Sequence, residues 1–212
     1  MPIIVPAVLT NSFDEFKKLI TRLSPVFGLV QIDIMDGEFV DNKSFDEIDK
    51  INEIENLPDL ELHLMVRHPL AEMEKWAKVK NIKKIIFHLE SLDDPLEVIN
   101  TIHGRCAQTG IAINPETPLE NVLPYLDRIN EVLFMTVHPG HQGAPFVPKV
   151  KNKILEFTNL ENRPLCAVDG GINETNIAEV KSWGVEVFCV GSALTRADNI
   201  NEIHKKLTKL LK

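Results

Sequence analysis

Short apolar runs rich in β-branched residues alternate with segments of helical periodicity along the whole chain. Apolar runs of this length between turn residues are typical of buried strands, and apolar residues spaced three and four apart indicate amphipathic helices. The predicted strands cover residues 3–9, 29–34, 60–65, 84–88, 110–114, 132–137, 165–168 and 185–190. The predicted helices cover residues 13–23, 45–54, 69–77, 94–103, 118–126, 147–157, 173–183 and 200–211.

This strict alternation predicts a parallel sheet whose strands are joined by right-handed crossovers. Eight strand–helix units without a linker in 212 residues favour one α/β domain, residues 1–212, folded as a small (β/α)8 TIM barrel. An open, doubly wound sheet is the alternative, and it predicts a glycine-rich turn after the first strand. Residues 8–11 read Val-Leu-Thr-Asn and contain no glycine, so we favour the barrel.

Polar residues end seven of the eight predicted strands, at the rim where a parallel barrel carries its active site. Asp33, His63 and Asp169 belong to this set. A single histidine at a strand end is more often a satisfied core residue than a ligand. Two carboxylates and an imidazole at one rim favour a functional site, because a buried carboxylate is costly unless it is paired or metal-bound.

Glycine-bearing turns follow the last two strands, Gly170-Gly171 after the seventh and Gly191-Ser192 after the eighth. Loops at these two places commonly bind phosphate in barrels, and a glycine lets backbone N–H groups approach an anion closely. We expect a phosphate group to lie against these turns, with Gly140 and Gly143 of the preceding loop as further contacts.

The net charge of the chain limits the classes of partner that it is expected to bind. Lys and Arg total 23 against 31 Asp and Glu, which gives a formal net charge of −8 and a pI near 5.4. Nucleic-acid binding depends on clustered basic residues, so we expect no nucleic-acid partner. No apolar run approaches the ~20 residues that cross a bilayer, and no secretory signal is evident, so we expect a cytoplasmic protein without membrane contact.

The three cysteines, Cys106, Cys166 and Cys189, are predicted to be inert thiols.

Six short motifs match one known family in order and spacing over nearly the whole chain. They are Asp33-x-Met35-Asp36-Gly37-x-Phe39-Val40, His63-Leu64-Met65, Asn114-Pro115-x-Thr117-Pro118, Met135-Thr136-Val137-x-Pro139-Gly140, Val168-Asp169-Gly170-Gly171-Ile172 and Gly191-Ser192-Ala193. On these motifs the chain resembles ribulose-phosphate 3-epimerase, and D-allulose-6-phosphate 3-epimerase is a close sister family.

The resemblance implies an isomerase of carbohydrate metabolism (the pentose phosphate pathway) that epimerises a ketose phosphate at C3, D-ribulose 5-phosphate to D-xylulose 5-phosphate. It makes Asp33 and Asp169 the catalytic pair, which moves protons on opposite faces of the sugar through an enediolate. It implies a divalent cation held by Asp33, His63, Asp169 and the residue at position 31, with zinc first and manganese, iron, cobalt or magnesium as alternatives. It places His63 and three methionines around the substrate: Met35, Met65 and Met135. It also implies a homo-oligomer.

Four positions at the same rim depart from the family pattern. Gln31 stands where the family has a metal-ligating histidine, and because an amide oxygen is a poorer zinc ligand, a weakened metal site is expected. Ala7 replaces a serine, the loop around Asp46 is shortened, and His141 replaces a phenylalanine. The alternatives are the allulose-phosphate epimerase, another phosphosugar enzyme on the same barrel, and a non-catalytic phosphosugar-binding homologue. Because both aspartates are retained, we favour the epimerase.

Overall fold

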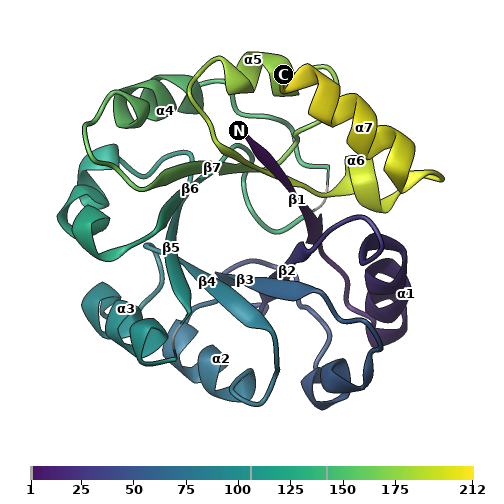
Figure 1. Cartoon of the computed structure of the whole chain (residues 1–212). Helices are drawn as coiled ribbons and strands as arrows, with labels where there is room; N and C mark the ends of the chain where they lie inside the picture. Colours follow the sequence, from purple (N-terminus) through teal and green to yellow (C-terminus); the bar gives the residue numbers. More distant parts are fainter. Residues whose placement is uncertain (1, 106, 142) are drawn as a thin grey trace.

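The strands of the molecule close into a ring. The computed structural model describes residues 2–105, 107–141 and 143–212, so Cys106 lies outside the described residues. Parallel strands pair in chain order, and the first pairs with the eighth to close the barrel, which confirms the predicted TIM barrel (Figure 1). The strands are β1 (Ile3–Val8), β2 (Leu29–Met35), β3 (Asp59–Met65), β4 (Ile82–His88), β5 (Gln108–Ile113), β6 (Glu131–Met135), β7 (Leu165–Asp169) and β8 (Val187–Val190).

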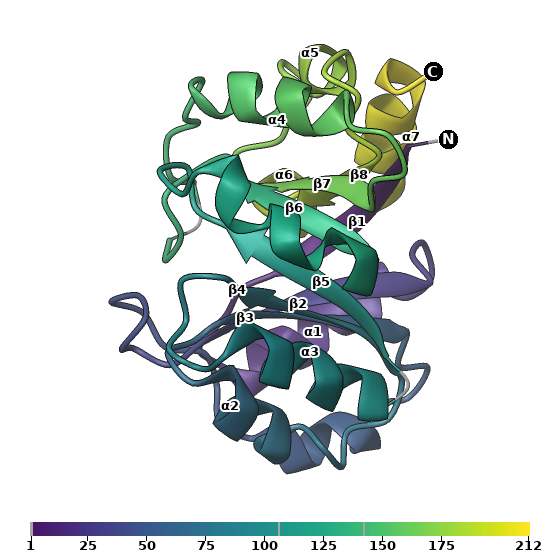
Figure 2. The same cartoon turned by 90° about the vertical axis from the view of Figure 1, so that its left-hand side faces the viewer.

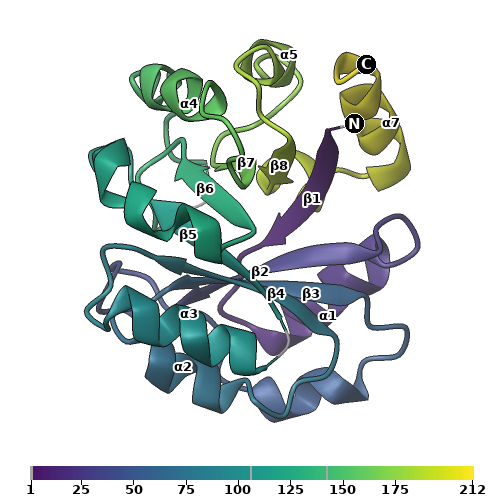
Figure 3. The ribbon, with the colours of Figure 1, turned by 60° about the vertical axis from the view of Figure 1, so that its left-hand side comes forward.

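Helices surround this ring, and α7 packs beside the start of β1, so that the two ends of the chain lie close together (Figures 2 and 3). The α-helices are α1 (Phe13–Leu23), α2 (Pro69–Lys75), α3 (Pro95–Gly104), α4 (Val150–Thr158), α5 (Ile177–Lys181), α6 (Ser192–Thr195) and α7 (Ile200–Leu210). The 3-10 helices are η1 (Ile48–Glu53), η2 (Leu119–Asn121) and η3 (Leu123–Arg128). No helix in the described part of the chain is long and apolar enough to cross a membrane.

Two predicted α-helices were wrong in type. Residues 118–126 form η2 and η3 because Pro124 has no N–H to donate and its ring excludes a regular helix through this segment. Residues 45–54 contain only the short η1, and Asp49 and Asn52 are residue types that are unfavourable in a helix interior. The Asn52 side chain instead donates to Lys78 O and accepts from Lys80 N. Both segments lie on the helical side of the barrel and leave the strand ends unchanged.

The apolar core has two parts. A large cluster fills the space between the strands and the outer helices, as a TIM barrel requires, while a small cluster of mostly short side chains fills the barrel itself. The small cluster includes Cys189, whereas Cys166 belongs to the outer cluster, and burial raises the pKa of both thiols, as expected for inert cysteines.

A charged triad interrupts the apolar interior of the barrel. Lys84 Nζ on β4 lies 2.7 Å from Glu61 Oε2 on β3 and 2.7 Å from Glu131 Oε2 on β6. All three side chains are buried, and together they carry one more carboxylate than ammonium. Glu61 precedes His63 by two residues and shares its inward direction, so the triad lies directly below the polar rim. These charges make the barrel interior more polar than its apolar strand pattern predicts.

Candidate active site

Side chains that enter the barrel alternate with those that face the helices, as the two-residue period of a strand requires. Asp33 near the end of β2 lies beside His63 of β3 in register. Asp169 is the last residue of β7 and pairs in register with Met135 of β6. The closed ring turns these strand ends toward one another, so the structure brings together the three residues that the sequence predicted, Asp33, His63 and Asp169.

His63 lies between the two aspartates. Its Nδ1 is 3.1 Å from Asp33 Oδ1 and 3.3 Å from Asp169 Oδ2, and its side chain is fully buried. The buried amide of Gln31 completes the cluster, because its Nε2 donates hydrogen bonds of 2.7 Å to Asp33 Oδ1 and to Asp169 Oδ2. The same nitrogen is 3.3 Å from His63 Nδ1.

The ionisation of this cluster follows from its burial and its charges. Burial and the neighbouring carboxylate of Asp169 raise the pKa of Asp33 to about 6, against hydrogen bonds that lower it. Burial alone lowers the pKa of His63, but the hydrogen bonds and negative charges of Asp169 and Asp33 outweigh it and raise the pKa to about 10. Near neutral pH the cluster therefore pairs a charged imidazolium with two carboxyl groups, one of which is easily protonated.

A chain of hydrogen bonds fixes the orientation of the His63 ring. Its Nε2 lies 3.0 Å from His88 Nε2, and His88 Nδ1 lies 3.2 Å from Glu90 Oε2. Burial raises the pKa of Glu90, but the hydrogen bond with His88 and the bonds from Thr117 and Asn114 N lower it to about 2. The Glu90 carboxylate thus stays charged and holds His88, which in turn directs Nδ1 of His63 toward the aspartates.

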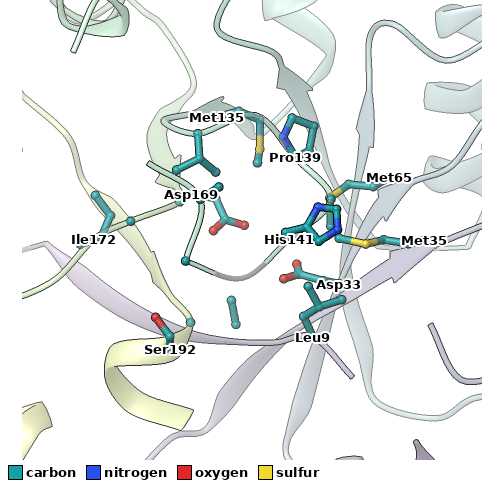
Figure 4. Close-up of a pocket in the computed structure, with 18 residues that line it drawn as sticks. Leu9, Asp33, Met35, Met65, Met135, Pro139, His141, Asp169, Ile172 and Ser192 are labelled. Atoms are coloured by element: carbon teal, nitrogen blue, oxygen red, sulfur yellow. The ribbon is translucent and has the colours of Figure 1, made fainter. Parts of the chain in front are cut away.

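A cleft that is open to solvent lies above this cluster (Figure 4). The carboxylates of Asp33 and Asp169 point into it from two sides, and methionine side chains form part of its wall. The wall includes the predicted methionines Met35, Met65 and Met135 and the altered positions Ala7 and His141. Soft, apolar thioethers around two carboxylates exclude water from the space where a substrate carbon would lie.

Ser44 and Asn42 anchor the loop that follows β2. Ser44 Oγ accepts from Met35 N at 2.9 Å and donates to Asp33 O at 2.9 Å, so it holds the end of β2 on both sides. Asn42 Nδ2 donates to Gly140 O at 3.0 Å and ties this loop to the one after β6. Asp46 does not line the cleft; its exposed side chain pairs with Lys43.

The glycine turns also line the cleft, and Ser192, which follows Gly191, is visible at its edge (Figure 4). Gly170 has a φ of 114°, and a Cβ there would lie 2.4 Å from Val137 Cγ2, so only glycine fits. Gly171 adopts a left-handed φ of 65° and also lines the cleft. All six glycine and serine positions predicted to contact a phosphate line this cleft: Gly140, Gly143, Gly170, Gly171, Gly191 and Ser192.

Three ligand atoms in the cluster have a spacing suited to a divalent cation. One atom each from Asp33, His63 and Asp169 lies within 4.8 Å of the others. The separations of 3.1 and 3.3 Å from His63 Nδ1 match the ~3.3 Å edge of a tetrahedron with metal–ligand bonds of ~2 Å. Gln31 approaches the same three atoms, and its Oε1 is buried and has no hydrogen-bond partner among the described residues. The residues present fit a cation with three donors, and the side chain of Gln31 lies beside them with its Nε2 facing the three ligand atoms.

Sequence reasoning missed Glu90, Ser44 and the interior triad of Lys84, Glu61 and Glu131. Glu90 carries a recognisable signal, because it lies two residues after the strand-end His88. The triad could have been found from charged residues at the inward positions of otherwise apolar strands. Ser44 carries no such signal, since its role depends on how the loop folds back onto β2.

A closed (β/α)8 barrel with two carboxylates, a buried imidazole and glycine turns at its carboxyl rim belongs to the class of TIM-barrel enzymes that act at the ends of their strands. The profile of the ribulose-phosphate 3 epimerase family matches residues 3–195. The chain therefore belongs to the ribulose-phosphate 3-epimerase family, and the isomerase class predicted from its motifs is confirmed.

Curated relatives agree with this assignment, and solved structures share the fold. Ribulose-phosphate 3-epimerase from Mycobacterium tuberculosis (strain ATCC 25618 / H37Rv) is 31% identical over 209 residues, which cover 93% of this chain and 88% of that protein. Ribulose-phosphate 3-epimerase from Buchnera aphidicola subsp. Baizongia pistaciae is 32% identical over 215 residues, covering 97% and 94%. The 3-hexulose-6-phosphate synthase of Salmonella typhimurium shares the fold, with a TM-score of 0.73, 13% identity and coverage of 100% and 98%.

Proposed function

We propose that this protein epimerises D-ribulose 5-phosphate at C3 to give D-xylulose 5-phosphate. The observation that carries the proposal is the pair of carboxylates, Asp33 from β2 and Asp169 from β7, which enter one methionine-walled cleft from two sides. A substrate carbon between two such groups can lose a proton to one and gain a proton from the other on the opposite face. Relatives at about 31% identity that are named ribulose-phosphate 3-epimerase support the choice of substrate.

The two aspartates divide the proton transfers between them. The hydrogen on C3 is acidic because the neighbouring C2 carbonyl delocalises the resulting charge as an enediolate. Abstraction needs one ionised carboxylate, and return of a proton needs one protonated carboxyl group. The pKa of Asp33, raised to about 6 by burial and by Asp169, lets the pair hold one proton near neutral pH. Either aspartate then acts as base for one direction of the reaction and as acid for the other.

The surroundings of the pair stabilise the charge that develops on the substrate. Without a cation, the His63 imidazolium, with its pKa of about 10, offsets the negative charge of the aspartates, and His88 with Glu90 keeps its ring in place. To act as a ligand, His63 would lose the proton on Nδ1, and the cation would then supply the positive charge. Asp33, His63 and Asp169, with Gln31 as a further candidate, would hold the divalent cation that the family implies. When bound, such a cation supplies Lewis-acid stabilisation of the two oxygens of the enediolate. The methionine wall keeps water from the carbanion face.

The phosphate of the substrate would bind at the glycine turns that line the cleft. Gly170, Gly171 and Gly191 line the cleft and have no side chains beyond hydrogen, so an anion can approach their backbone N–H groups. An uncharged amide cradle also suits a protein with a net charge of −8, because binding then needs no basic patch.

The test of this proposal is turnover of a panel of ketose phosphates by the purified protein. We expect formation of D-xylulose 5-phosphate from D-ribulose 5-phosphate, with a kcat/KM at least tenfold above that for D-allulose 6-phosphate. Preference for allulose 6-phosphate would assign the sister activity, and binding without turnover of any ketose phosphate would make the protein a binder. Asp46→Asn, at an exposed position outside the cleft, serves as the control variant.

A further inference from the structure

Gln31 presents the wrong end of its amide to a cation. Its Nε2 lies at the corner above the three candidate ligand atoms, 2.7 Å from Asp33 Oδ1, 2.7 Å from Asp169 Oδ2 and 3.3 Å from His63 Nδ1. An amide nitrogen has two hydrogens and no free lone pair, and both hydrogens are used by the carboxylates. In this orientation the residue bridges the two aspartates and cannot ligate a metal.

The other end of the same amide lacks a partner. Gln31 Oε1 is fully buried and accepts no hydrogen bond from any described residue. Beside it in register, on the neighbouring strand, is Glu61, whose Oε2 lies 2.7 Å from Lys84 Nζ and whose buried Oε1 has no hydrogen-bond partner among the described residues. Gln31 Oε1 and Glu61 Oε1 are thus two buried acceptors on paired strands, and neither has a donor among the described residues. This arrangement favours a second orientation of the amide.

We propose that the side-chain amide of Gln31 adopts two orientations, and that a cation binds only when the amide rotates so that Oε1 takes the place of Nε2. In the first, its N–H groups bridge Asp33 and Asp169 in the metal-free protein. In the second, Oε1 faces the cation as the fourth ligand, and the N–H groups turn toward the layer that contains Glu61. The cation replaces the two hydrogen bonds that the carboxylates lose.

The chemistry of the resulting ligands selects the cation. With Gln31 Oε1, Asp33, Asp169 and His63, the site offers three oxygens and one nitrogen. Oxygen ligands suit magnesium and manganese, whereas zinc favours imidazole and thiolate. The second orientation therefore makes this chain a site for a hard divalent cation, in contrast to a site in which position 31 is histidine. The inference names the cation of the proposed epimerase reaction and rests on the proposed function only for the use of that cation.

The test measures metal affinity in protein first freed of metal by a chelator. Free Mn²⁺ is followed by electron paramagnetic resonance, and Zn²⁺ is followed by competition with a chromophoric chelator. The variants are Gln31→His, which adds imidazole, and Gln31→Leu, which removes both ends of the amide. Gln108→Leu, at the exposed start of β5, is the matched control.

We expect Gln31→His to raise the affinity for Zn²⁺ relative to Mn²⁺ at least tenfold, and Gln31→Leu to weaken Mn²⁺ binding at least tenfold. The side-chain amide resonances that disappear in Gln31→Leu should also shift when the unmodified protein is saturated with Mg²⁺. Mn²⁺ affinity equal in Gln31→Leu and in the unmodified protein, or resonances unmoved by Mg²⁺, would overturn the inference. These readouts need no turnover, so absence of epimerase activity would count against the proposed function and leave this test standing.

Discussion

One oxygen of Asp33 and one oxygen of Asp169 each accept a 2.7 Å hydrogen bond from the same nitrogen, although β8 and β1 separate their strands in the barrel. The shared donor is Nε2 of Gln31. It fixes the separation of the two carboxylates while leaving the second oxygen of each without a hydrogen bond from any described residue. Those free oxygens are the ones available for proton transfer in the cleft.

Replacing either aspartate by asparagine should separate exchange of the C3 hydrogen with solvent from epimerisation at C3. Asn keeps the shape of the side chain but cannot carry the proton, so kcat should fall on the order of 10²–10⁴-fold in Asp33→Asn and in Asp169→Asn. The aspartate that remains still serves one face of C3. Each variant should therefore exchange the C3 hydrogen of one epimer only, as measured by NMR in D2O. Exchange of both epimers by one variant would show that the two carboxylates do not work on separate faces.

A negative charge at the glycine turn should weaken binding of the phosphate. Gly171 has a φ of 65°, which Asn and Asp tolerate better than other residues, and a Cβ there makes only ordinary contacts of 3.5 Å or more. We expect Gly171→Asp to raise KM for the sugar phosphate at least ~10-fold above Gly171→Asn, because one repulsive charge a few Å from the phosphate costs ~1–4 kcal/mol. Equal KM values in these two variants would place the phosphate elsewhere.

The interior triad should make the stability of the protein depend on pH. Burial and the charge of Glu61 raise the pKa of Glu131 from 4.5 to about 7, despite the opposing charge of Lys84. The folded state then binds a proton that the unfolded state releases, so Glu131 makes the free energy of unfolding fall as pH rises from about 4.5 to about 7. In Glu131→Gln this contribution is absent, and the change across that window should be smaller by on the order of 1–3 kcal/mol.

Urea unfolding of the unmodified protein and of Glu131→Gln at several pH values measures this difference directly. Glu156→Gln, on the exposed side of α4, is the matched control and should follow the unmodified protein. Parallel curves for Glu131→Gln and the unmodified protein would mean that Glu131 stays ionised throughout this range.

The barrel itself could be predicted from the sequence because each strand is a short apolar run and each connection restarts the helical period. The two segments that were predicted as α-helices and form 3-10 helices differ in whether the sequence indicates the error. Pro124 indicates, from the sequence alone, that residues 118–126 do not form one α-helix. Residues 45–54 have apolar residues at helical spacing, but only the 3-10 helix η1 forms there. The conformation of this segment depends on how it packs against the barrel, which the spacing alone does not show.

The candidate site was predictable where it depends on strand ends and not where it depends on side-chain orientation. Asp33, His63 and Asp169 converge because closed parallel strands end at one rim, which the strand pattern already implies. The bridging amide of Gln31 could not be predicted, because the direction of a buried amide is set by partners on other strands. The resemblance of the motifs marks Gln31 only as a departure from an expected histidine, whereas the structure shows hydrogen bonds from its amide to both aspartates.

We propose that Asp33 and Asp169 transfer protons at C3 of a ketose phosphate. Incubation of the purified protein with D-ribulose 5-phosphate in D2O, followed by ¹H NMR, tests it most directly. We expect loss of the C3 proton signal together with the appearance of D-xylulose 5-phosphate deuterated at C3, and no such change with the double variant Asp33→Asn, Asp169→Asn. A C3 proton that persists in D2O, with Mn²⁺, Mg²⁺ or Zn²⁺ supplied in turn, would contradict it.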